Sequence, residues 1–156
     1  MAFDALKFLL ADRPVLTHIW RGPFRGARLV INPRHSLRKV FGLYEHELNE
    51  WLAQALRRVN RVLDVGANDG YFTFGCAAAF RRLGKPREII AFESHTRHVA
   101  MLRKSVALQT EASVRFKIVQ SSVGKELKPG MTTLDSAEWA VGDPVDKGQH
   151  IGEDRR

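Results

Sequence analysis

The chain has 156 residues, 44% of them hydrophobic, so it can form one globular domain with a core but is too short for two. Its net charge of +8 favours anionic partners, but the basic residues are scattered in pairs such as Arg57 with Arg58, which favours solvated helix faces and makes a nucleic-acid groove the weaker alternative. The single cysteine, Cys76, excludes an intramolecular disulfide and indicates a reducing compartment.

The first twelve residues contain charges at Asp4, Lys7 and Asp12, which interrupt any apolar segment of signal-peptide length. No other stretch is long and apolar enough for a transmembrane segment. We therefore expect a cytoplasmic protein. The first helix has an apolar face, which we expect to dock on the domain; peripheral membrane contact is the alternative.

Residues 15–20 and 27–31 are short apolar pieces separated by glycine and proline, and they predict two strands of an N-terminal subregion over residues 1–41. A helix follows that should pack on a sheet. Its apolar residues recur at helical spacing and form one stripe: Leu48, Trp51, Leu52, Ala55, Leu56 and Val59.

The central region alternates strand and helix. Residues 61–66 predict a parallel strand buried on both faces, and a helix is expected over residues 71–83. Residues 88–93 predict the next strand, and Ser94 or Thr96 is expected to cap the helix after it.

A third strand is predicted by the alternation of Val114, Phe116 and Ile118 with basic residues. This order implies an α/β fold, a Rossmann-like parallel sheet with flanking helices. Beyond it, residues 132–139 are expected to form one or two helical turns and residues 136–156 a polar, frayed tail.

The strand at residues 62–65 leads through Asp64 into a turn with Gly66 and Gly70 that opens a helix. Glycine lets the backbone turn tightly and approach a ligand, and the free N–H groups of a helix start attract a carboxylate or phosphate. Glu93 ends the next strand, where a carboxylate can accept hydrogen bonds from a ribose diol. These features predict a nucleoside-bearing ligand.

The spacing does not match the G-x-G-x-x-G dinucleotide fingerprint, and no P-loop lysine follows. The string from Val62 to Thr73 is similar to motif I of class I methyltransferases. With Gly42-Leu-Tyr-Glu-His-Glu-Leu upstream and Ala-Phe-Glu93 downstream, the chain resembles the FkbM family of O-methyltransferases over residues 42–135. This segment would be the half domain that binds S-adenosylmethionine (S-adenosyl-L-methionine).

The resemblance implies roles for ten residues in cofactor binding. Asp64 would support the glycine turn, and the carboxylate of Glu93 would accept hydrogen bonds from the ribose hydroxyls. The other residues would surround the methionine end, namely Gly66, Asn68, Gly70, Phe72 and Thr73, or the adenine end, namely Ser94, Gln120 and Ser121.

Structural alternatives remain for several of these residues. Asp64 could cap the turn, Asn68 could serve only as a turn residue, and Glu93 could pair with Arg97 or His98. His95 and His98 have a spacing that permits a metal pair, but no third ligand is evident, so no metal is expected.

The family fold has seven strands in the order 3-2-1-4-5-7-6, and the sequence after Asp135 does not resemble its fourth strand. We therefore expect a C-terminally truncated chain with three core strands, no assignable catalytic residue and little methyl transfer. Strand 62–65 would be left as an open edge that favours self-association.

Three functions follow. The first is methyl transfer to a small-molecule or glycan hydroxyl, on a sugar, polysaccharide or secondary metabolite. The alternatives are an inactive cofactor-binding remnant or interaction module, and a basic RNA-binding protein, although nucleic acid is the less expected partner.

Overall fold

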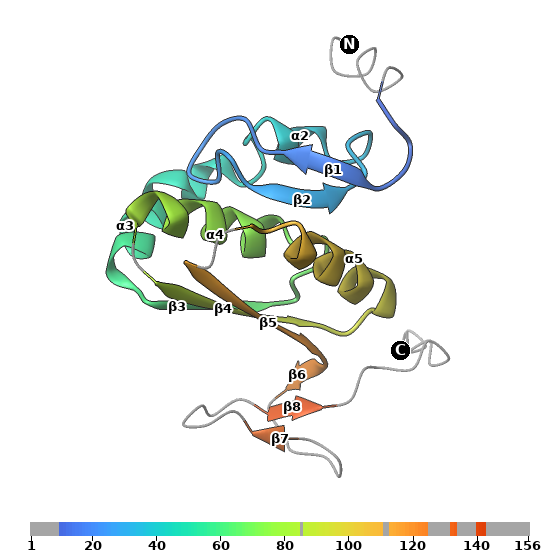
Figure 1. Ribbon diagram of the computed structural model, residues 1–156, viewed down its shortest axis with the longest axis vertical. Coiled ribbons are helices and arrows are strands. Elements are labelled where there is room, and N and C mark those ends of the chain that lie inside the picture. Colours follow the sequence, from blue (N-terminus) through green and yellow to red (C-terminus); the bar gives the residue numbers. More distant parts are fainter. Residues whose placement is uncertain (1–9, 85, 111–112, 125–131, 134–139, 143–156) are drawn as a thin grey trace, which may run out of the picture.

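The computed structural model describes residues 10–84, 86–110, 113–124, 132–133 and 140–142 (Figure 1). Most of the first helix expected at the N-terminus lies outside these ranges. Within them, no helix is both long and apolar enough to cross a membrane.

A three-stranded parallel sheet forms the centre of the fold. Its strands are β3 (Arg61–Val65), β4 (Arg87–Glu93) and β5 (Val114–Gln120), in the order β3-β4-β5. The crossovers run through α4 (Tyr71–Leu83) and α5 (Thr96–Ala107), and both helices cover the same face of the sheet (Figure 1). This arrangement confirms the predicted α/β class and is that of an incomplete Rossmann-like fold.

The helix α4 is buried along most of its length because it lies between two layers. On one side is the sheet, and on the other is an antiparallel hairpin of β1 (Val15–His18) and β2 (Arg28–Ile31), as Figure 1 shows. The hairpin confirms the two predicted N-terminal strands. Leu29 and Ile31 of β2 join the same hydrophobic cluster as Phe74 and Phe80 of α4.

The predicted cap of α5 is wrong. The residue before the helix is His95, and no side-chain cap bond is present there. Thr96 is the first helical residue, and its hydroxyl accepts a hydrogen bond from Nε2 of Gln120 instead. The N–H of His95 donates to the carboxylate of Glu93, so the helix start is fixed from the preceding strand.

Before the sheet, the chain forms α2 (Leu37–Val40), the short 3₁₀ helix η1 (His46–Leu48) and α3 (Asn49–Arg58). The predicted helix is present, but it contacts α4 rather than the sheet. Only a narrow stripe of α3 is covered, so Leu52 and Leu56 are buried whereas Trp51 is 65% exposed. The stripe predicted to pack on the sheet is therefore only partly covered, and the helix packs mainly against α4.

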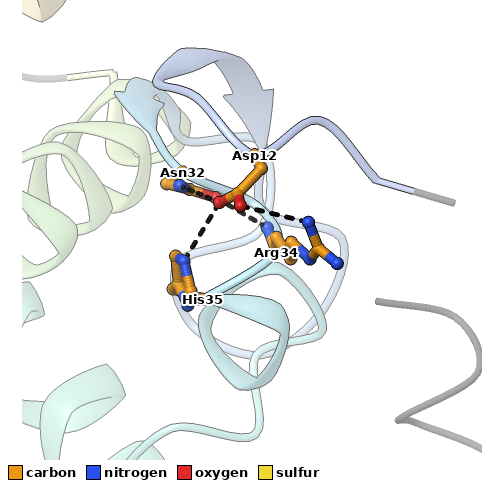
Figure 2. Close-up of polar contacts among 4 residues, drawn as sticks. All are labelled: Asp12, Asn32, Arg34 and His35. Carbon is orange, nitrogen blue, oxygen red and sulfur yellow. Dashed lines mark hydrogen bonds and ion pairs between the residues drawn. The ribbon is translucent and has the colours of Figure 1, made fainter. Parts of the chain in front are cut away.

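A polar cluster ties the segment before β1 to the turn after β2 (Figure 2). One carboxylate oxygen of Asp12 accepts from Nδ2 of Asn32 and lies 3.1 Å from Nε2 of His35, while the other accepts from Arg34 at 3.0 Å. The hydrogen bond from Asn32 is the largest cause lowering the pKa of Asp12, and the charge of Arg34 adds to it.

The strand β3 is not buried on both faces as the sequence indicated. Its residues alternate between exposed and half-buried, and Leu63 and Val65 are 43% and 54% exposed. The cause is the placement of α4 and α5 on one face of the sheet. On the other face, Ile90 and Phe92 form a second, small cluster with Val119.

A small antiparallel sheet follows β5. It consists of β6 (Ser122–Gly124), β7 (Thr132–Thr133) and β8 (Ala140–Gly142), in the order β6-β8-β7. Residues 132–133 are therefore extended rather than helical, and residues 140–142 form a strand within the segment expected to be frayed. Both β6 and β7 pair with β8. Each strand is too short for its sequence to show a recognisable alternation of apolar and polar residues. Residues 134–139 and 143–156 lie outside the described residues.

Candidate functional site

The turn after β3 combines three left-handed residues with two bonds to β4. The N–H groups of Gly66 and Ala67 both donate to the carbonyl of Phe92, at 2.9 and 3.0 Å. The φ angles of Gly66, Asn68 and Gly70 are 76°, 52° and 86°. The tight glycine turn expected from the sequence is present, and the structure shows in addition that it is fixed against the end of the neighbouring strand.

The two glycines of this turn have different environments. A Cβ added to Gly66 would meet no heavy atom within 4 Å, so the backbone there faces open space. A Cβ on Gly70 would lie 2.6 Å from Cε2 of Phe74 and would also strike Leu102. Gly70 is thus required for packing, whereas Gly66 leaves room for a ligand to approach the backbone.

Glu93 is buried at the end of β4, and its carboxylate is held by two backbone donors. Oε2 accepts from the N–H of Asn68 at 2.7 Å, and Oε1 accepts from the N–H of His95 at 2.8 Å. Nδ1 of His98 lies 3.9 Å from Oε1, so of the two expected salt-bridge partners it is His98 that approaches. An ionised carboxylate has about four acceptor positions, so two remain for a ligand.

Asp64 connects β3 to the first turn of α4. Its Oδ2 accepts a 2.5 Å hydrogen bond from Oγ1 of Thr73, which is fully buried. Burial raises the pKa of Asp64, and the hydrogen bonds from Thr73 act in the opposite direction. The side chain of Thr73 is therefore occupied in fixing the turn, and Asp64 is its hydrogen-bond acceptor.

The remaining predicted residues divide into two groups. Gln120 lies opposite Glu93 in the β4–β5 register, and the buried Ser121 donates its N–H to the carbonyl of Glu93 at 3.0 Å. Ser94 directly follows Glu93, so these residues share one end of the sheet. Phe72 belongs elsewhere, because its ring contacts those of Phe24 and Tyr71.

Sequence reasoning missed an ion pair that holds the same turn from its other side. Nζ of Lys39 lies 2.6 Å from Oδ2 of Asp69, and both side chains are largely buried. The ammonium also lies 5.1 and 5.8 Å from the ring centroids of Tyr44 and Tyr71. Lys39 is 30 residues upstream of Asp69, and no local pattern indicates such a contact.

Two tyrosines next to the turn have perturbed acidities. Burial is the largest cause raising the pKa of Tyr71 to about 12. The neighbouring charge of Glu45 is the largest cause raising the pKa of Tyr44, and Glu45 itself has a left-handed φ of 49°. Both phenols therefore stay protonated at neutral pH and can act as hydrogen-bond donors.

No metal centre or reactive thiol is evident in the part of the chain that the structure describes. The rings of His95 and His98 lie 5.6 Å apart, but no group of three or more potential ligands surrounds them or any other point there. Cys76 is buried, and burial raises the pKa of its thiol to about 12, which agrees with an inert core residue.

A cavity of about 730 Å³ opens at the opposite end of the sheet, among Asn60, Arg61, Arg87 and Arg115. It lies at the amino ends of the strands, whereas ligands of open parallel sheets bind outside the carboxyl ends. The candidate site is therefore the carboxyl end, where Gly66, Asn68 and Glu93 come together.

Comparison with known proteins adds nothing to this choice, because no family model and no curated protein matches the chain.

The raised pKa of Asp64 predicts a specific pH dependence of stability. The contribution of Asp64 to the free energy of unfolding is complete below its unfolded pKa of about 3.8. This contribution is lost as pH rises through the higher pKa of the folded state. Asp64→Asn removes this loss, so the variant should gain free energy of unfolding relative to the wild type as pH rises from 4 to 7. Urea denaturation at several pH values measures it.

Asp12→Asn is a control that should stay nearly parallel to the wild type from pH 4 to 7, because the folded pKa of Asp12 is lowered and its effect, of opposite sign, falls below this range. Its carboxylate stabilises the fold above pH 3.8, and this contribution is lost as pH falls through the folded pKa. Curves for Asp64→Asn and wild type that stay parallel from pH 4 to 7 would show that Asp64 is not under a burial penalty.

Proposed function

We propose that this chain binds S-adenosylmethionine at the carboxyl ends of β3 and β4, as the cofactor-binding part of an FkbM-type O-methyltransferase. The observation that carries the proposal is the position of Glu93, buried at the end of β4 beside a left-handed glycine turn that faces open space. A nucleoside with a charged tail requires this combination of an acceptor and an approachable backbone.

The geometry supports distinct tasks for the residues. The two unused acceptor positions of Glu93 would receive the ribose hydroxyls, and the backbone at Gly66 and Asn68 would approach the methionine end. The Asp64–Thr73 hydrogen bond and the Lys39–Asp69 ion pair would keep the turn in place without contacting the ligand. Ser94, Gln120 and Ser121 would lie towards the adenine.

When bound, S-adenosylmethionine would supply an electrophilic methyl group. An acceptor hydroxyl of a sugar, polysaccharide or secondary metabolite would attack this methyl carbon in line, so that the O–C bond forms as the C–S bond breaks, S-adenosylhomocysteine leaves and the hydroxyl proton passes to a base. The protein contributes chiefly by positioning the two reactants, and a base would assist the attacking hydroxyl. We assign no described residue to that base. A cofactor-binding module without turnover is the second candidate, and an assay of labelled methyl transfer to sugar acceptors distinguishes the two.

Replacing Glu93 tests the binding site. Glu93→Ala should weaken binding of S-adenosylhomocysteine, the demethylated cofactor, by about 1.5–3 kcal/mol, because hydrogen bonds to a charged group are lost. Glu93→Gln keeps one acceptor oxygen and should lose less. Isothermal titration calorimetry measures both.

Glu88→Gln is the matched control, because Glu88 pairs with Arg61 at the amino end of the same strand and should leave the affinity unchanged. Circular dichroism of each variant establishes that the fold is retained. Equal affinity of folded Glu93→Ala and wild type would refute the assignment of the ribose to Glu93.

We further propose that the open edge of β3 pairs with the same edge of a second molecule. Among the described residues, β3 pairs only with β4. The N–H of Gly66 points to β4, so by alternation the N–H groups of Leu63 and Val65 point away from it. An edge with unpaired donors and half-exposed apolar side chains favours symmetric association.

Light scattering over a dilution series tests this association. The wild type should shift towards a dimer as concentration rises, and Leu63→Lys should remain monomeric because a charge would lie in the paired edge. Leu48→Lys, at a position of similar exposure on η1, should still dimerise. A monomer at all concentrations with slowly exchanging amides at Leu63 and Val65 would contradict the proposal.

A further inference from the structure

A basic hollow lies on the loop that joins β1 to β2, over the end of α4. Its cavity of about 440 Å³ is lined by Trp20, Arg21, Gly22, Arg25 and Arg82. Arg82 is eleven residues beyond Tyr71, which places the hollow about 16 Å along the helix from the candidate cofactor site. It is therefore a separate feature, and the proposed function does not use it.

The loop that forms this hollow is firmly held. Phe24 is 2% exposed and packs against α4 at Gly75, where a Cβ would lie within 2.3 Å of its ring. The N–H of Gly26 donates to Ile19, and the guanidinium of Arg82 donates to the carbonyls of Pro23 and Arg25. The backbone around the hollow and the guanidinium of Arg82 are thus preorganised.

Trp20 presents an aromatic surface at this fixed position. Trp20 is 61% exposed, although its backbone N–H donates to the carbonyl of Val40 and its ring meets that of Phe41 edge to face, with the centroids 5.2 Å apart. An indole held in one place but open to solvent is suited to stacking with a planar ring. Stacking on such a side chain costs little conformational entropy.

The charged side chains that line the hollow are basic. Three arginines line it, and among the described residues no acidic side chain does. Desolvation is the largest cause lowering the pKa of Arg82, and the charges of Arg25 and Arg81 act in the same direction. An anion in the hollow would relieve this repulsion, and guanidinium groups match phosphate oxygens in geometry.

We infer that this hollow binds single-stranded nucleic acid, with one base stacked on Trp20 and the adjoining phosphates at Arg21 and Arg25. One aromatic ring combined with a cluster of arginines is the chemistry of strand-binding surfaces without sequence preference. A membrane surface is a poorer match, because it favours several protruding apolar side chains, whereas Trp20 is the one large apolar side chain that the described residues contribute to this concave lining.

Fluorescence anisotropy with a labelled ten-nucleotide uridine RNA tests the inference. Trp20→Ala should weaken binding roughly 5- to 150-fold, since one stacked base is lost. Trp51→Ala removes the similarly exposed indole of α3, which is not in the hollow, and should leave binding unchanged. The slope of log affinity against log salt should become shallower by about 0.7 in Arg25→Gln, because one phosphate contact is lost.

Arg103→Gln, which removes an exposed positive charge from α5, controls for net charge and should keep the wild-type slope. Equal losses in the Trp20→Ala and Trp51→Ala variants, or no measurable RNA binding by the wild type, would overturn the proposal. Binding to phosphatidylserine vesicles that depends on Trp20, without RNA binding, would overturn it in favour of a membrane contact. Neither result depends on whether the chain binds S-adenosylmethionine.

Discussion

The carboxylate of Glu93 joins three parts of the structure that are separate in sequence. It accepts from the N–H of Asn68 in the turn after β3 and from the N–H of His95 at the start of α5, while its own backbone ends β4. Because Glu93 is itself buried, these two hydrogen bonds let one side chain keep the turn and the helix start together. The candidate site depends directly on the carboxylate of Glu93, because a ribose would donate hydrogen bonds to its unused acceptor positions.

The layers of the fold explain why one face of the sheet is covered while the other face is more open. The helices α4 and α5 pack on one face of the sheet, and the hairpin β1–β2 packs on the outer side of these helices (Figure 1). Small residues such as Gly75 and Ala78 allow α4 to be contacted closely from both sides. On the opposite face, the part of the chain that the structure describes forms the small cluster of Ile90, Phe92 and Val119. The apolar side chains of β3 are consequently half exposed.

The sequence was sufficient for those parts of the fold that local pattern controls. Alternating apolar residues from Val114 to Ile118 predicted β5, and the glycine turn with Glu93 one strand later predicted which residues meet at the end of the sheet. Contacts between distant segments could not be predicted in this way. The ion pair of Lys39 with Asp69 has no local signature, and the exposure of Trp51 depends on α3 lying beside α4 rather than on the sheet.

A titration of isotopically labelled protein with S-adenosylhomocysteine, followed by amide NMR spectra, tests the central claim most directly. If the carboxyl end of the sheet is the cofactor site, the amides of Gly66, Asn68 and His95 shift with a common affinity, while those of Arg87 and Arg115 at the amino end stay unchanged. Shifts concentrated at the amino end, or none at saturating ligand, would contradict the account.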